Sequence, residues 1–212
     1  MTATMTAEWT QLGRMDTARK YVAATWRPPF VSASLDDVHG QAMTIGVLFV
    51  CTANICRSPM AEGVFRSMAG RAGLDAAFTV DSAGTFGGHV GEPPALPAIK
   101  AAARRGYDIA SLRARQVVAA DIARFDLVLA MDRGHLAQLR RWARRRLALR
   151  LLMFTSFCPA GGPVDVADPY GGAARDYEKA LDLIEAGCQG LLEALTPLVR
   201  QFVLEDCQGV KI

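Results

Sequence analysis

The sequence predicts an α/β fold in which a parallel sheet is covered by helices on both faces. Two observations lead to this prediction. Short apolar runs, such as MTIGVLFV at residues 43–50, have the composition of strands buried on both faces. These runs alternate with longer segments that carry apolar residues at helical spacing, and such alternation is typical of parallel strands joined by crossover helices.

The first helix is expected directly after the first strand. Ser58 suits the position that caps a helix, and Pro59 fits the first helical turn. Glu62 carries a negative charge that complements the helix dipole. We therefore predict a helix from Ser58 to about Arg71.

The later elements follow the same alternation. The segment AFTVDSAGT predicts a second strand, and PALPAIKAAARRG predicts a helix that Gly106 ends. Third and fourth strands are expected in FDLVLAMD and LRLLMF, with a helix in RGHLAQLRRWARRR between them. The segment ARDYEKALDLIEAGCQGLLEALTPLV carries an apolar stripe and predicts the last helix.

Composition divides the chain into three parts. Residues 1–42 hold two of the three tryptophans and the pair Pro28 and Pro29, but no run that is typical of a strand. We expect this part to be a flexible or partly helical extension. The domain itself is expected at residues 43–200, followed by a tail at 201–212.

Composition also narrows the class of protein. The 212 residues are 51% apolar and 21% charged, which is ordinary for a globular protein with one substantial core. The net charge of +3 gives no argument for nucleic-acid binding, although 20 of the 24 basic residues are arginine, which suits phosphate ligands. No apolar run is long enough for a membrane helix, so we expect no membrane insertion. The five cysteines lack zinc-like spacing, and we interpret them as reduced thiols of a cytoplasmic protein.

The loop after the first strand carries the residues with the clearest chemistry. Cys51 and Arg57 stand there at the spacing Cys-x5-Arg. A loop that curls at a helix N-terminus points N–H groups inward and binds a dianion such as phosphate. The same field stabilises a thiolate, and an arginine can hold two phosphate oxygens at once. The loop therefore predicts attack on phosphorus through a phosphocysteine intermediate.

This chemistry needs a proton donor for the leaving oxygen. Asp168 lies in VADPYGG after the fourth strand, and the loops at the carboxyl ends of parallel strands meet at one edge of the sheet. Taken alone, the segment is an ordinary Asp-Pro-Gly turn. Beside the Cys51 loop we interpret Asp168 as the general acid and Tyr170 as a residue that lines the entrance.

Five segments together resemble the low-molecular-weight protein tyrosine phosphatase family. In chain order they are VCTANICRSPMAE, DSAGT, ARQV, FDLVLAMDR and DPYGG. The resemblance covers residues 44 to about 196. It implies a four-stranded parallel sheet in a doubly wound, flavodoxin-like three-layer sandwich, and two-step hydrolysis without a metal or an organic cofactor.

The resemblance also implies roles for the matching catalytic positions. Cys51 corresponds to the nucleophile and Arg57 to the phosphate clamp that stabilises the transition state. Asp168 corresponds to the general acid, which later serves as the base for water. The implied partners are phosphotyrosine proteins and, by likeness to bacterial members, a tyrosine autokinase.

Other positions of the loop match the family as well. Ser58 is implied to hydrogen-bond the thiolate, and Asn54 to hold the loop in a strained shape. Cys56 is implied to form a reversible disulfide with the nucleophile, which shields it from overoxidation. The remaining members of the phosphate-binding loop are Thr52, Ala53 and Ile55.

Four positions depart from the family pattern. Ala53 replaces a frequent glycine, and Gly171 replaces a second tyrosine. The aromatic that usually forms one wall of the cleft falls at Gly88, where Phe86 could lean in as a substitute. A histidine that often supports the loop asparagine aligns with Leu112. A wider cleft or a weaker activity is therefore expected.

Three alternatives to phosphotyrosine hydrolysis stay open. Relatives that act on phosphoarginine tend to carry threonine at the position of Ile55, so the isoleucine favours phosphotyrosine. Arsenate reduction needs two further cysteines that are close together in the middle of the chain. Residues 57–157 contain no cysteine, and Cys158, Cys188 and Cys207 are far apart. The third alternative, a phosphotyrosine-binding module, is suggested by Gly88 and Leu112 but has no use for an acid.

Other polar and thiol residues have structural interpretations. Cys158 and Cys188 are expected to pack as small apolar residues. The arginine cluster at 140–150 is interpreted as a solvated helix face. Of His39, His89 and His135, only His89 is expected near the cleft.

Overall fold

The computed structural model describes residues 44–143 and 147–208, with the side chains of 202–208 left out of the description. Its centre is a parallel sheet with the strand order β2-β1-β3-β4. The strands are β1 (Ile45–Cys51), β2 (Phe78–Gly84), β3 (Leu127–Ala130) and β4 (Leu151–Met153). The predicted fold class, a doubly wound α/β sandwich with four parallel strands, is confirmed.

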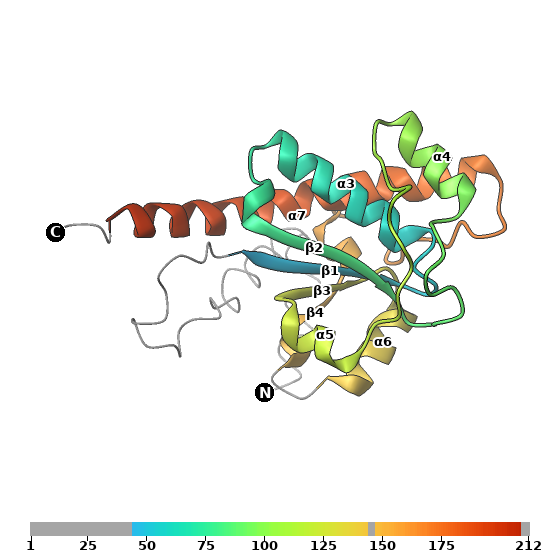
Figure 1. Ribbon diagram of the computed structural model, residues 1–212, viewed down its shortest axis with the longest axis horizontal. Helices are drawn as coiled ribbons and strands as arrows, with labels where there is room; N and C mark the ends of the chain where they lie inside the picture. Colours follow the sequence, from blue (N-terminus) through green and yellow to red (C-terminus); the bar gives the residue numbers. More distant parts are fainter. Residues whose placement is uncertain (1–43, 144–146, 209–212) are drawn as a thin grey trace.

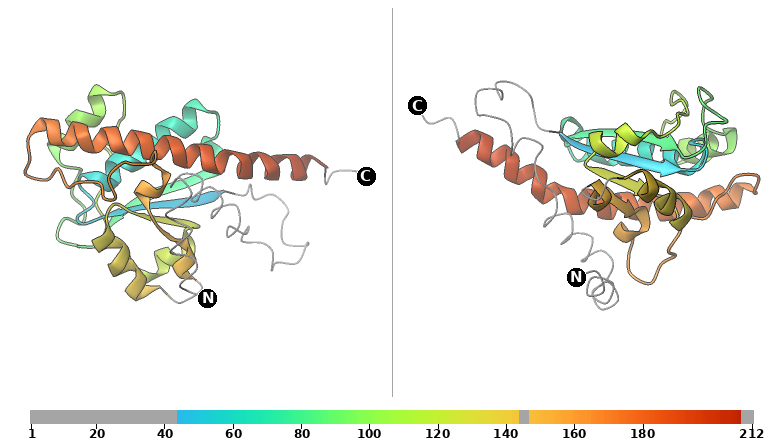
Figure 2. Two further views of the ribbon diagram at one scale, coloured as in Figure 1. Left: turned by 180° about the vertical axis from the view of Figure 1, so that it is seen from behind. Right: turned by 90° about the horizontal axis from the view of Figure 1, so that it is seen from below.

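Helices cover both faces of this sheet (Figures 1 and 2). One face carries α3 (Arg57–Arg71), α4 (Leu96–Arg104) and α7 (Ala174–Gln208). The opposite face carries α5 (Ala119–Arg124) and α6 (Arg133–Trp142). Short 3-10 turns lie at η2 (Asp75–Ala77), η3 (Leu147–Arg150) and η4 (Phe154–Phe157).

The central strand β1 is buried along its whole length. Its alternate side chains enter two separate cores: Val47 and Phe49 join the cluster under α3 and α7, while Leu48 and Val50 join the cluster under α5 and α6. Burial on both faces explains why the strand is continuously apolar in sequence.

The register of the sheet determines where the loops meet. Cys51 at the end of β1 pairs with Gly84 at the end of β2, and Val50 pairs with Ala130 at the end of β3. Val166, which follows β4 in the chain, donates its N–H to the carbonyl of Met131 at 2.9 Å. The loops after all four strands therefore gather at the carboxyl edge of the sheet, as expected for this topology.

The predicted start of the first helix is wrong in detail. α3 begins at Arg57, its N-cap is Cys56, and no side chain caps it. Ser58 lies inside the first turn, where its buried hydroxyl faces Cys51 rather than the helix amides. Glu62 lies beyond the first turn and is buried against Ser82, so it does not serve the helix dipole.

The remaining helices differ from prediction mainly in extent. The six-residue α5 has too short an apolar pattern to be recognised in the sequence. α7 continues to Gln208, whereas the sequence placed a tail from residue 201. The predicted extension at 1–42 lies outside the described residues. None of the described helices is both long and apolar enough to span a bilayer.

Candidate active site

The loop of residues 51–58, called the Cys51 loop below, is attached to the end of β2. Thr85 donates its N–H to the carbonyl of Cys51 at 2.9 Å, and Phe86 donates to that of Thr52 at 2.8 Å. A Cβ on Gly84 would lie 2.6 Å from the carbonyl oxygen of Thr52. Glycine at position 84 thus allows the loop to lie directly against the strand end.

Asn54 fixes the shape of the loop. With φ of 57°, it is the single non-glycine residue in the described part of the chain that has a left-handed backbone. Its Nδ2 donates to Ser58 Oγ at 2.9 Å and to Ser82 Oγ at 2.8 Å, and its Oδ1 accepts from the backbone N–H of Arg115 at 2.9 Å. Asparagine tolerates this backbone, and these bonds satisfy its buried amide.

Behind Asn54, a second row of buried polar groups supports the loop. Ser82 Oγ donates to Glu62 Oε2 at 2.6 Å, and Arg66 pairs with Glu62 Oε1 at 2.8 Å. Burial raises the pKa of Glu62 above its ordinary value, against smaller opposing contributions from Ser82 and Arg66. Leu112, where a supporting histidine is missing, packs against the core instead. Ser82 and the backbone of Arg115 thus hold Asn54 without that histidine.

The sulfur of Cys51 lies at the centre of the loop and is 2% exposed as a residue. Its Sγ is 2.9 Å from Ser58 Oγ and accepts from the backbone N–H of Asn54 at 3.3 Å. It also stands at the N-terminal end of the 15-residue helix α3. Hydrogen-bond donors and a positive helix end both stabilise a thiolate.

Arg57 is a buried guanidinium with one unused donor. Nη1 donates to Asp132 Oδ2 at 2.9 Å and to the carbonyl of Val166 at 3.1 Å. Nη2 donates to Asp168 Oδ2 at 2.6 Å and to Thr52 Oγ1 at 3.2 Å. Nε is buried and finds no acceptor within the described residues. A buried donor without a partner is costly unless a ligand completes it.

Asp168 combines the two interpretations that the sequence left open. Its Oδ1 accepts from the backbone N–H of Tyr170 at 3.2 Å, which is the local turn, and its Oδ2 pairs with Arg57. With a side chain that is 45% exposed, it is much more accessible than Arg57.

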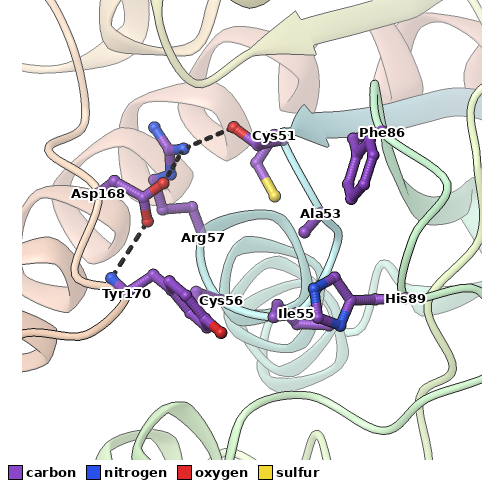
Figure 3. Close-up of a pocket in the computed structure, with 10 residues that line it drawn as sticks. Cys51, Ala53, Ile55, Cys56, Arg57, Phe86, His89, Asp168 and Tyr170 are labelled. Carbon is purple, nitrogen blue, oxygen red and sulfur yellow. Dashed lines mark hydrogen bonds and ion pairs between the residues drawn. The ribbon is translucent and has the colours of Figure 1, made fainter.

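These residues line a pocket of about 190 Å³. Figure 3 shows Asp168 and Tyr170 on one side of the Cys51 sulfur and Phe86 and His89 on the other. The lining is completed by members of the loop, namely Thr52, Ala53, Ile55, Cys56 and Arg57. The structure thus brings together the predicted loop residues, acid and cleft aromatics, while Asn54 and Ser58 lie behind the lining.

Phe86 fills the space beside Gly88. A Cβ built on Gly88 would lie 2.2 Å from the ring of Phe86. The Phe86 ring is therefore folded back over the glycine, and it faces the pocket while 57% exposed.

Cys56 is a buried member of the Cys51 loop, and its thiol faces Tyr177 on α7. Burial raises the pKa of its thiol to about 12, against a smaller lowering by a hydrogen bond with the Tyr177 hydroxyl. Cys158 and Cys188 are also buried among apolar residues, as predicted. Of the arginine cluster, Arg140 and Arg141 are exposed, whereas Arg150 donates to the carbonyls of Ala123 and Phe125.

Sequence reasoning missed two residues at this site. Asp132 caps α6 and pairs with Arg57, and His135, one turn into α6, approaches Thr52 Oγ1 with Nε2 at 2.9 Å. The available signal was the spacing Asp-x-x-His directly after a buried strand. It reads equally well as an ordinary helix cap.

The fold and the arrangement of Cys51, Arg57 and Asp168 define the class of cysteine-dependent phosphatases. A sequence profile of the family "Low molecular weight phosphotyrosine protein phosphatase" matches residues 46–201. The chain is 47% identical over 158 residues to a low molecular weight protein-tyrosine-phosphatase of Streptomyces coelicolor, over 72% of this chain and 94% of the relative. It is 34% identical over 152 residues to a low molecular weight phosphotyrosine protein phosphatase of Homo sapiens, over 71% of this chain and 95% of the relative.

Solved structures agree with the sequence relatives. YfkJ from Bacillus subtilis matches with a TM-score of 0.70 and 36% identity, over 74% of this chain and 98% of that chain. A protein tyrosine phosphatase from Entamoeba histolytica with Hepes in the active site also matches with a TM-score of 0.70, at 31% identity over 73% of this chain and 98% of that chain. The chain belongs to the low molecular weight protein-tyrosine phosphatase family.

Proposed function

We propose that this protein hydrolyses phosphotyrosine in proteins by two successive displacements at phosphorus, with Cys51 as nucleophile. The observation that supports this most directly is the state of Arg57. Its guanidinium is buried beside the Cys51 loop, one Nη holds Asp168, and Nε has no partner. A phosphoryl dianion supplies the acceptors that this group lacks.

In the first displacement, the phosphoryl oxygens accept from the loop amides and from Arg57, whose Nη2 exchanges Asp168 for the substrate while Nη1 keeps its contacts with Asp132 and Val166. The Cys51 sulfur attacks phosphorus, and the bond to the tyrosine oxygen breaks. Asp168 donates its proton to that oxygen, so that a neutral phenol leaves. The product on the protein is a phosphocysteine.

In the second displacement, water attacks the phosphocysteine and the sulfur–phosphorus bond breaks. Asp168, now a carboxylate, accepts the proton of the water. Ser58 Oγ, 2.9 Å from Cys51 Sγ, stabilises the departing thiolate. Fixed donors of this kind stabilise charge as it develops without reorganisation at the moment of reaction.

The walls of the pocket favour an aromatic phosphate ester. Phe86 and Tyr170 are exposed aromatics on its two sides, and Ile55 adds an apolar surface. Aromatic rings gain about 0.5–1.5 kcal/mol from an aromatic neighbour beyond their burial. We therefore expect phosphotyrosine peptides to be cleaved faster than phosphoarginine or phosphoserine peptides, and faster phosphoarginine cleavage would contradict the choice of substrate.

The decisive experiment is hydrolysis of a phosphotyrosine peptide without metal by the native chain, Cys51→Ser and Asp168→Asn. Cys51→Ser is expected to abolish turnover. Asp168→Asn is expected to slow it by about 10²–10⁴-fold, and less for aryl phosphates whose leaving groups need no proton. Asp165→Asn is the matched control, because Asp165 lies three residues away and pairs with exposed Arg133 at 2.8 Å.

The same experiment separates the rival functions. If the reduced native chain binds phosphotyrosine peptides without turning them over, it is a binding module. Thioredoxin-dependent reduction of arsenate would assign it to the arsenate reductases. Turnover that survives Cys51→Ser would overturn the proposed mechanism.

Redox protection by Cys56 is a further part of the proposal. Peroxide would oxidise Cys51 to a sulfenic acid, and the Cys56 sulfur would displace water to form a disulfide that thiols reduce. The prediction is that native activity returns after peroxide and then dithiothreitol, whereas Cys56→Ser loses activity irreversibly. Equal recovery in both proteins would exclude this role.

We infer a cytoplasmic location from the use of reduced cysteines, and a tyrosine autokinase as a partner from the resemblance to bacterial members. Incubating a tyrosine-phosphorylated autokinase with the native chain and with Cys51→Ser tests the partner. Loss of the label with the native chain alone is the expected result.

A further inference from the structure

We propose that His135 is a positioning residue for the reaction, because it closes a ring of contacts that holds the Arg57 guanidinium in place. The ring passes from Arg57 through Thr52, His135 and Asp132 and back to Arg57. The inference builds on the proposed function, since it assigns a role in the site where Arg57 binds phosphate.

Four contacts form the ring. Arg57 Nη2 donates to Thr52 Oγ1 at 3.2 Å, and Thr52 Oγ1 lies 2.9 Å from His135 Nε2. The other ring nitrogen, His135 Nδ1, lies 3.0 Å from Asp132 Oδ1. Asp132 Oδ2 accepts from Arg57 Nη1 at 2.9 Å and completes the circuit.

The weakest of these contacts is the one between His135 Nδ1 and Asp132. The two atoms are close enough for an ion pair, but the approach lacks hydrogen-bond geometry, and Nδ1 is otherwise without a partner in the described chain. The same carboxylate oxygen accepts the backbone N–H of His135 at 2.9 Å. Asp132 therefore has one oxygen on the start of α6 and the other on Arg57, and the imidazole lies beside it.

The direction of the protons follows from the partners of Thr52. Burial lowers the pKa of His135 below its ordinary value of 6.5, with Asp132 raising it and Arg57 lowering it to smaller extents. The imidazole is therefore neutral at neutral pH. With its proton on Nδ1 beside Asp132, Nε2 accepts the Thr52 hydroxyl proton. The oxygen of Thr52 is then turned to accept from Arg57.

Protonation of His135 would break this pattern. An imidazolium donates from Nε2 to Thr52, so the Thr52 hydroxyl proton has to point elsewhere, and a positive charge is added near Arg57. The charged groups that act on His135 are Asp132 at the start of α6, Arg57 on α3, and Asp165 and Asp168 on the loop after β4. Their combined effect sets the pH at which the ring changes.

The location of His135 argues for positioning rather than for packing alone. It is 5% exposed and lies on α6, on the side of the sheet opposite to α3. Its ring nitrogens face two residues, Thr52 and Asp132, and both of those bind Arg57 directly. A change at His135 therefore reaches the guanidinium along two routes, although His135 does not touch Arg57.

The test compares a substitution that removes both polar contacts of the His135 ring with one that keeps the contact to Thr52. His135→Leu removes both polar contacts at similar volume, and His135→Gln keeps an acceptor near the position of Nε2. We expect His135→Leu to lower kcat/KM for a phosphotyrosine peptide by about 10–10²-fold, because small displacements of a positioned group have effects of that size. His135→Gln should recover most of this loss. The dissociation constant for inorganic phosphate should rise in parallel with the loss in kcat/KM.

A double-mutant cycle with Thr52→Val tests whether the two residues act through one ring. If they do, Thr52→Val costs much less in the His135→Leu background than in the native protein. Additive losses would overturn the proposal. So would failure of His135→Gln to recover activity.

Two controls separate positioning from stability and from the proposed function itself. Leu139→Ala removes a fully buried side chain one turn further along α6, and it should lower Tm while leaving kcat/KM unchanged.

The second control is the pH dependence. The ratio of native to His135→Leu activity is taken at each pH, which cancels the titration of the substrate. It should fall toward one as pH drops below about 6.5, and a flat ratio would contradict the proposal. An inactive native chain would refute the proposed function, whereas an active native chain with an equally active His135→Leu variant would refute this inference alone.

Discussion

The floor and the rim of the pocket are built in opposite ways. The floor is the layer of buried polar residues directly behind the pocket lining. It consists of Asn54, Ser58, Ser82 and Glu62, all nearly inaccessible and joined by hydrogen bonds of 2.6–2.9 Å. The rim consists of Phe86, His89 and Tyr170, of which Phe86 is 57% and Tyr170 64% exposed. The floor can keep one shape because its polar groups are satisfied by one another, by Arg66 and by the backbone of Arg115. The exposed side chains of the rim have more room to adjust to a substrate.

This contrast predicts where substitutions matter. A change in the floor leaves buried polar groups without partners and alters both stability and catalysis. A change in the rim alters only the binding of the substrate, which KM reports. The predictions below run from the floor to the rim.

The largest effect is expected at Asn54. Asn54→Ala leaves the hydroxyls of Ser58 and Ser82 and the N–H of Arg115 without this partner. Alanine also lacks the polar side chain with which asparagine offsets the left-handed backbone at φ of 57°. We expect the free energy of unfolding to fall by about 3 kcal/mol, and kcat/KM to fall about 10²-fold. Urea unfolding and steady-state kinetics measure the two quantities.

Asn54→Gly separates the two causes of that loss. Glycine accepts the left-handed backbone without strain but makes none of the hydrogen bonds. If Asn54→Gly is as impaired as Asn54→Ala, the hydrogen bonds hold the loop. A nearly native Asn54→Gly would show that backbone conformation alone does.

The next effect is a pH dependence of stability that Glu62 controls. Because burial raises its pKa above the ordinary value of 4.5, its contribution is fully present below that value and is lost as pH rises through the folded-state pKa. Glu62→Gln keeps an acceptor for Ser82 and removes the charge. The free energy of unfolding of the Glu62→Gln variant, relative to that of the native protein, should therefore increase as pH rises above 4.5. If the difference in unfolding free energy between the two proteins stays constant with pH, burial does not raise the pKa of Glu62.

Substitution of Phe86 in the rim should affect binding and leave chemistry intact. We expect Phe86→Ala to raise KM for a phosphotyrosine peptide by about 3–10-fold, from the ~0.5–1.5 kcal/mol of an aromatic contact, with kcat within about twofold. Moving the ring by Phe86→Ala with Gly88→Phe should restore KM, because the Phe86 ring now occupies the space that a side chain at position 88 needs. A double variant no better than Phe86→Ala would show that position 88 cannot form the wall.

The smallest effect is expected at His89. Its Nδ1 pairs at 2.8 Å with Glu92, whose side chain is 57% exposed, and pairs of that kind contribute about 0–1 kcal/mol. His89→Gln should change kcat/KM by less than about threefold. A larger loss would mean that His89 contacts the substrate and that the rim is less adaptable than the comparison implies.

The parts of the molecule that follow from sequence are those with a strong local pattern. The β1 strand is apolar at every position because both of its faces are buried, so it was recognisable without its partners. The spacing of Cys51 and Arg57 between a strand and a helix predicted the loop, and the carboxyl-edge rule for parallel sheets predicted that Asp168 would reach it. The geometry brings Arg57 Nη2 and Asp168 Oδ2 to 2.6 Å.

The parts that did not follow from sequence depend on pairs that only the fold creates. Ser58 and Glu62 have the residue types of a helix start, and their sequence positions predict a cap and a charge that complements the helix dipole. In the folded chain, contacts with Cys51 and Ser82 dominate, because a buried hydroxyl and a buried carboxylate need partners more than the helix end does. His135 was equally hidden, since its partner Thr52 is 83 positions away in the chain.

The ion pair between Arg57 and Asp168 also bears on how a catalytic cycle ends. Inorganic phosphate has to leave the same guanidinium that held the substrate, and a bare guanidinium in a buried site is unfavourable. Asp168 Oδ2 lies 2.6 Å from Nη2, and we expect it to take the place of the departing anion there. In that role the tethered carboxylate would act as an exchange ligand, which makes firm capture of a dianion compatible with ready release of product.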